Sequence, residues 1–137
     1  MTQIVQPTYR GSAAELFLRS REPGGLATAG AEFGEDWAVT VVLASADYPA
    51  SSSKGDVIRG LDEAGAIEGV EITHAGTARE GGDLVTAGGR VLNVTGLGPD
   101  AAAARNLAYE ASGLIDFDGK QMRSDIAARA VERTAAA

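Results

Sequence analysis

The hydrophobic and polar positions along the chain predict one strand that is apolar on both sides. Residues 37–45 read WAVTVVLAS, are rich in β-branched side chains, and are apolar at both alternating sets of positions. A strand with this pattern is usually covered on both faces. The sequence therefore predicts that residues 37–45 form the central strand of a sheet.

Three further runs, residues 70–75, 83–87 and 90–95, have the character of strands. The last two are joined by Gly88 and Gly89 alone. A two-residue Gly-Gly link between strand-like runs favours a type I′ hairpin turn, in which both central residues need positive φ. This interpretation places Val85 opposite Leu92 and predicts an antiparallel meander with one apolar side.

Helix start signals occur at three places. Ser12 and Glu15 have the spacing of a capping box, which predicts a short helix to about residue 20. Asp100 follows Pro99 and places a negative charge at the start of a second helix, expected to end at Gly113. Ser124 is the expected cap of a last helix. Together these elements predict an α+β fold, a small antiparallel sheet with helices packed on one side.

Composition and charge narrow the possible functions. The chain has 137 residues, the size of one ordinary domain, and 45% of them are hydrophobic. Its net charge of −7 disfavours nucleic acid and anionic membranes as partners. With no cysteine and one histidine, disulfides, a thiolate zinc site and a multi-histidine metal site are excluded. We recognise no secretion signal and no apolar run long enough to cross a bilayer, so we expect a cytoplasmic protein.

Two motifs that resemble functional sites are better explained by structure. Residues 96–101 read G-x-G-x-x-A before a helix, but the preceding strand is expected to be antiparallel, whereas a dinucleotide site needs a parallel βαβ unit. We interpret this run as a glycine turn that leads into a helix. His74 alternates with Val70 and Ile72, and we interpret it as a hydrogen-bonded, partly buried packing residue.

Two arginines remain as candidates for binding an anion. Arg90 follows the Gly-Gly pair, and Arg123 lies in a polar loop before the last helix. A guanidinium pairs with two phosphate oxygens at once, and glycine allows a ligand to approach the main chain. The alternative is that both arginines only keep the surface soluble. The residues alone leave this choice open.

Three stretches resemble a known family. They are AVTVVLASADYPASSSKGDVIRGLDEA, GVEITHAGTAREGGDLVTAGGRVLNVTGLG and FDGKQMRSDIAARA, and they span about residues 36–131. Together they resemble the C-terminal domain of phosphoribosylamine-glycine ligases, which are ATP-grasp enzymes. Ala50, Met122 and Ala127 depart from the family pattern, in which glycine, an aromatic residue and glycine are usual.

The resemblance implies a C-terminal-like domain at residues 36–137, preceded by a lead-in at 1–35 that is a remnant of the ATP-grasp region. It implies that the N-terminal and ATP-grasp domains are partners, in the same chain or as a separate subunit. Those domains would hold ATP and Mg²⁺, so this chain is expected to bind no cofactor and to be inactive alone.

The family reaction joins glycine to 5-phosphoribosylamine in purine biosynthesis, and this domain would form one wall of its site. By matching position, Gly88, Gly89, Arg90 and Arg123 would bind substrate, and none of them would be catalytic. A second hypothesis is a non-catalytic binding or scaffold module that keeps the fold for packing against a partner chain.

Overall fold

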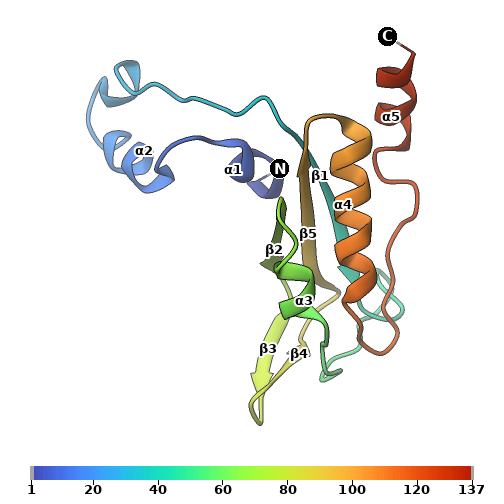
Figure 1. Cartoon of the computed structure of the whole chain (residues 1–137). Coiled ribbons are helices and arrows are strands. Elements are labelled where there is room, and N and C mark those ends of the chain that lie inside the picture. The colour runs from blue at the N-terminus through green and yellow to red at the C-terminus, as the bar shows by residue number, and fades with distance from the viewer. Residues whose placement is uncertain (1, 137) are drawn as a thin grey trace.

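A computed structural model describes residues 2–136 (Figure 1). The helices are α1 (Thr2–Thr8), α2 (Ala13–Arg19), the 3₁₀ helix η1 (Gly25–Ala27), α3 (Leu61–Gly65), α4 (Ala101–Leu114) and α5 (Ala128–Ala135). The strands are β1 (Trp37–Ala44), β2 (Val70–His74), β3 (Thr77–Glu80), β4 (Asp83–Thr86) and β5 (Arg90–Gly98). These elements form a three-stranded antiparallel sheet and a separate two-stranded ribbon.

The central strand of the larger sheet is β5, so the prediction that residues 37–45 form the central strand is wrong. The strand order is β1-β5-β2, and β1 is an edge strand. The sequence did not indicate that β5 is central, because β5 contains polar residues. These residues are buried and form hydrogen bonds with neighbouring strands. Asn93 donates a hydrogen bond to Thr73, and the hydroxyls of Thr95 and Thr40 lie 2.8 Å apart. The central strand thus contains polar residues paired across strands, whereas we expected it to be an apolar run.

The predicted hairpin at Gly88–Gly89 is also wrong. β4 pairs with β3 rather than with β5, and the turn between them contains Gly81 and Gly82, with φ of 59° and 100°. Val85 therefore lies opposite Ala78 and not opposite Leu92. Both edges of β5 are already occupied by β1 and β2, so β4 has no edge of β5 on which to pair. Gly88 and Gly89 connect the ribbon to the main sheet, with φ outside the positive region.

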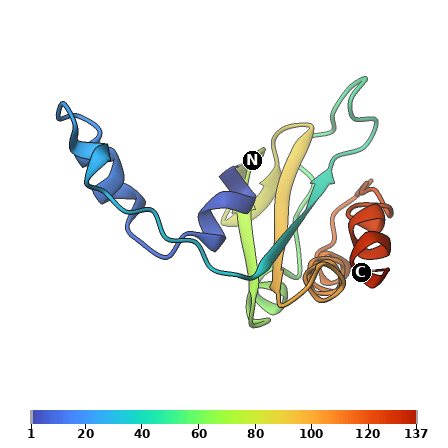
Figure 2. The same ribbon diagram turned by 90° about the horizontal axis from the view of Figure 1, so that it is seen from above.

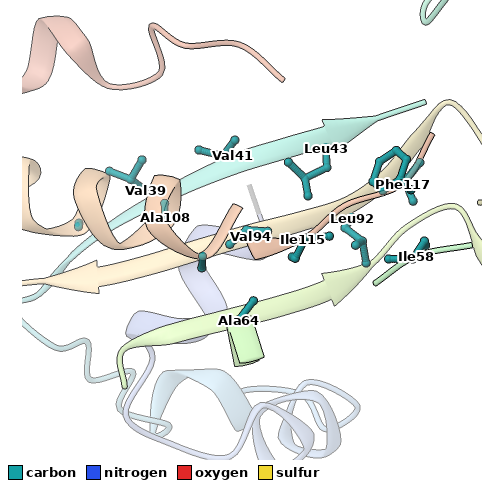
Figure 3. Close-up of a cluster of buried hydrophobic side chains, with 13 residues drawn as sticks. Val39, Val41, Leu43, Ile58, Ala64, Leu92, Val94, Ala108, Ile115 and Phe117 are labelled. Atoms are coloured by element: carbon teal, nitrogen blue, oxygen red, sulfur yellow. The ribbon is translucent and has the colours of Figure 1, made fainter. Parts of the chain in front are cut away.

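Helix α4 covers one face of the sheet and closes the core (Figure 3). The negative charge of Asp100 lies at the start of α4, as predicted, and its carboxylate caps the helix by accepting a hydrogen bond from the Ala103 amide at 2.7 Å. The helix continues through Gly113, the residue predicted to end it, as far as Leu114. The alanines of α4 let it approach the sheet so closely that Gly96 faces helix backbone. The core consists of Val39, Val41, Leu43, Ile58, Ala64, Val91, Leu92, Val94, Ala104, Ala108, Ala111, Ile115 and Phe117.

The α+β fold class is confirmed. Helices α3 and α5 pack against α4 on the same side of the sheet. In addition, α1 lies over the opposite face, where the Thr95 hydroxyl donates to the Gln3 carbonyl at 3.2 Å (Figure 2). Helix α5 starts after Ala127, which has φ of 58°, so Ser124 is not its cap as expected. The Ser124 carbonyl instead accepts a hydrogen bond from Arg105.

Residues 2–36 form an arm that is attached to the sheet through α1 (Figure 1). Helix α2 and η1 extend away from the rest of the molecule and contain no buried residue. The predicted helix is present, and Ser12 caps it by accepting from the Glu15 amide at 3.3 Å. The Glu15 carboxylate, however, binds Arg19 instead of completing the capping box. Within residues 2–136, no helix is long and apolar enough to span a membrane.

Candidate functional site

Two glycine-containing motifs of the sequence meet at one end of the main sheet. The amides of Ala75 and Gly76 both donate to the Val91 carbonyl, at 3.0 and 3.1 Å, and the Ala87 amide donates to the Gly76 carbonyl at 2.8 Å. A Cβ at Gly76 would overlap the backbone of Gly88. The H-A-G-T and G-G-R segments are therefore held together by main-chain hydrogen bonds and by close contact between their backbones. We call residues 76 and 88–90, with Tyr48, the glycine end.

The Tyr48 ring covers Gly89 at this end of the sheet. A Cβ at Gly89 would overlap the ring, and the Gly89 carbonyl accepts a hydrogen bond from the Ser45 amide at 2.9 Å. Tyr48 as a residue remains 40% exposed. Gly89 is thus required by the close approach of an aromatic side chain that comes from a turn more than forty residues earlier in the chain.

A small polar cluster fastens the loop before α3 to the same end. The Asp56 carboxylate accepts hydrogen bonds from the hydroxyls of Ser53 and Thr86, at 2.5 and 2.8 Å. The Thr86 hydroxyl in turn accepts from the Asp56 amide at 3.0 Å. These bonds, from Ser53 first and Thr86 second, lower the pKa of Asp56. The anionic carboxylate thereby binds the end of β4, the strand that precedes the Gly88–Arg90 segment. Sequence reasoning missed this cluster, because its members are thirty residues apart.

Arg90 presents a free cation beside the glycines. It is exposed, and within residues 2–136 its guanidinium has no hydrogen-bond or ion-pair partner. Next to it, Gly88 has no side chain that would separate a ligand from the main chain, whereas the Tyr48 ring lies over Gly89. The structure therefore brings together three of the four residues proposed to bind substrate. A planar cation without a protein partner is suited to an anion such as a phosphate.

Arg123 is not equivalent to Arg90. Its guanidinium binds both carboxylate oxygens of Asp125, at 2.8 and 2.6 Å. This contact raises the pKa of Arg123 and lowers that of Asp125. Ala44 separates the two regions, since it pairs with Arg90 on one side and with Gln121 on the other. An anion at Arg123 would have to compete with Asp125.

His74 ends β2 at the margin of an open groove of about 700 Å³. Its Nδ1 lies 3.0 Å from the Thr77 hydroxyl, which agrees with the expected hydrogen bond. The ring is exposed rather than partly buried, because β2 is an edge strand and His74 is its last residue. Arg59 and Arg79 also line this groove. Among the described residues, no group of three or more acidic, histidine or cysteine side chains could hold a metal ion.

Comparisons with known proteins agree on one family. The family model described as phosphoribosylglycinamide synthetase, C domain, matches residues 38–129. The phosphoribosylamine–glycine ligase of Neisseria meningitidis serogroup A is 50% identical over 133 residues, which are 96% of this chain and 31% of that protein. That of Streptomyces coelicolor is 44% identical over 132 residues, which are 94% of this chain and 32% of that protein.

The fold agrees with a solved relative. The crystal structure of phosphoribosylamine–glycine ligase from Thermotoga maritima matches with a TM-score of 0.62 and 37% identity, over 74% of this chain and 25% of that chain. The chain thus spans about a quarter to a third of the length of the relatives it matches. The match to the Neisseria protein is long enough to take in most of the arm as well as the domain.

Proposed function

The chain belongs to the phosphoribosylglycinamide synthetase C-domain family, and from this premise we propose that it forms one wall of the site at which glycine is joined to 5-phosphoribosylamine. In that reaction ATP converts the glycine carboxylate to an acyl phosphate with release of ADP. The amine of phosphoribosylamine then attacks the acyl carbon, inorganic phosphate leaves, and the amine gives up a proton. The product is glycinamide ribonucleotide, a purine precursor.

We propose that ATP and Mg²⁺ are held by the part of the relatives' length that this chain does not span. Binding and transfer of phosphoryl groups require a cradle of backbone amides and cations together with metal-binding carboxylates. The glycine end instead offers a single free guanidinium beside two glycines, which suits the ribose 5-phosphate of the second substrate. The remainder of the ligase is accordingly the partner of this chain.

The observation that carries the proposal is the free guanidinium of Arg90 next to Gly88 and Gly89. Its planar fork pairs with two phosphate oxygens, and the absence of a side chain at Gly88 allows the phosphate to come close. Arg123 is the weaker candidate, because Asp125 already occupies its guanidinium. Arg90 and Arg123 therefore make a matched pair for a test.

The test uses a chimera, the Neisseria meningitidis ligase with its matching segment replaced by this chain. In Arg90→Lys the charge remains but the two-pronged contact is lost, and a charge-assisted hydrogen bond contributes about 1.5–3 kcal/mol. We expect the KM for phosphoribosylamine to rise about tenfold or more, while those for glycine and ATP stay unchanged. Arg123→Lys should have a smaller effect.

Equal kinetics for the chimera and both variants would contradict the role of Arg90 and favour the scaffold hypothesis. A parallel rise of all three constants in Arg90→Lys would also contradict it, because a local phosphate contact cannot change the binding of the other two substrates alike. Thermal unfolding of each variant shows whether the fold is intact.

A further inference from the structure

The arm carries a groove that is lined mostly by apolar side chains. The groove has a volume of about 740 Å³ and lies between α1, α2 and the segment that returns to β1. Its apolar lining comes from Val5, Tyr9, Ala13, Leu16, Phe17, Leu26 and Phe33. Three of these are large and mostly in contact with solvent, since Phe17 is 73% exposed, Leu26 52% and Phe33 53%. Contiguous exposed apolar surface of this kind marks an interaction site.

One wall of the groove is fixed by contacts between the end of α1 and the segment that returns to β1. The Arg10 amide donates to the Glu32 carbonyl at 2.8 Å, and the Gly34 amide donates to the Thr8 carbonyl at 2.7 Å. The rings of Tyr9 and Phe33 pack with their centroids 5.6 Å apart. An ion pair between Arg10 and Asp36 fastens the base of the arm. This wall is preformed, which lowers the entropic cost of binding a partner.

Helix α2, which forms the other wall of the groove, gains little stability from its own contacts. Helix α2 has seven residues, none of them buried, and a helix of this length is marginal in water without tertiary packing. The apolar side of α2 faces the groove, so tertiary packing of α2 would have to occur on that side. A partner that fills the groove would therefore stabilise α2 as well as bury Phe17.

The observations favour a particular occupant. The chain spans 31% of the Neisseria ligase, and the match includes most of the arm, so the rest of that ligase is available to cover it. A second copy of this chain is disfavoured, because each copy has a net charge of −7. The groove lining is apolar and therefore suits an apolar element of a neighbouring domain.

We propose that the arm groove is the docking surface on which the remainder of the ligase packs, through an apolar element that covers Phe17, Leu26 and Phe33. This proposal rests on the proposed function and adds the surface by which this chain is attached to the rest of the ligase. It places the attachment on residues 2–36, on the far side of the sheet from α4, and leaves the glycine end free for substrate.

Hydrogen exchange of α2 tests the proposal, measured on the isolated chain and on the chimera. If the groove is covered in the chimera, the α2 amides should exchange about tenfold more slowly there, which corresponds to ~1.4 kcal/mol. Phe17→Ser should remove this protection. Leu18→Ser is the matched control: Leu18 is 63% exposed on the same helix but does not line the groove, so protection should persist.

Equal exchange in the isolated chain and the chimera would overturn the proposal. Protection in the isolated chain that grows with protein concentration and is lost in Phe17→Ser would also overturn it, in favour of a second copy as the occupant. Turnover of the chimera separates this proposal from the proposed function. A protected but inactive chimera supports the docking surface alone, and an active chimera without protection supports the function alone.

Discussion

Replacing Gly89 by alanine should destabilise the protein because of the Tyr48 ring. The φ of Gly89 lies outside the positive region, so alanine meets no backbone penalty there. The added Cβ would, however, overlap the ring carbons of Tyr48. The strain therefore depends on a side chain and disappears when that side chain is removed.

The size of the effect follows from how far Tyr48 can yield. Forcing extra atoms into a packed site costs about 1–3 kcal/mol. Because Tyr48 is 40% exposed and its ring can move outward, we expect the lower half of this range for Gly89→Ala. In the Tyr48→Ala background the same change should cost close to zero, so the two substitutions should be coupled by ~1 kcal/mol or more.

Gly81→Ala is the matched control, because it isolates the conformational effect. Gly81 has φ of 59°, and nothing lies within 4 Å of a Cβ built there. An L-residue in this region costs about 1–2 kcal/mol. That cost should be the same with and without Tyr48.

Urea unfolding of the full chain gives all the required free energies. The measurements compare Gly89→Ala and Gly81→Ala, each in the presence and absence of Tyr48→Ala. If Gly89→Ala costs as much without the ring as with it, then Tyr48 is not the reason for glycine at this position, and the packing described for the glycine end is incorrect.

Two further predictions concern the fold and the polar cluster. Gly96→Ala should lower the free energy of unfolding by at least about 1–3 kcal/mol, because its Cβ would overlap backbone atoms of α4 that cannot move aside. Gly113→Ala lies within α4 and faces open space, so it should stabilise the protein by about 0.5–1 kcal/mol. Urea unfolding measures both effects. Hydrogen bonds from Ser53 and Thr86 lower the pKa of Asp56, so the charged carboxylate stabilises the fold above the unfolded-state pKa, and this contribution is lost as pH falls through the folded-state pKa. Between pH 7 and about 3 the wild type should therefore lose more stability than Asp56→Asn, and equal losses would contradict the role of the cluster.

Local signals in the sequence predicted the elements well. The β-branched run forms β1, Ser12 caps α2, and Asp100 lies at the start of α4, because each of these signals depends on neighbours within a few residues. The order of strands depends on contacts between distant residues. The sequence contains Gly-Gly pairs at 81–82 and 88–89, and only the pairing of β5 with β1 and β2 decides that the first is the hairpin turn.

The candidate site was predicted only in part. Gly88, Gly89 and Arg90 are adjacent in the sequence, so any fold keeps them together. What surrounds them comes from elsewhere: Tyr48 from the turn after β1, and Asp56 from the loop before α3. No local sequence pattern predicts these contacts. Arg123 is held by Asp125 only two residues away, and that pairing could have been anticipated from the spacing of opposite charges.

The central claim is that this chain serves as the C domain of a phosphoribosylamine–glycine ligase. The most direct measurement is glycine- and phosphoribosylamine-dependent release of ADP, by the isolated chain and by the chimera with the Neisseria ligase. We predict no turnover by the isolated chain and turnover by the chimera. A chimera that unfolds cooperatively and binds ATP but releases no ADP, or an isolated chain that turns over, would contradict the claim.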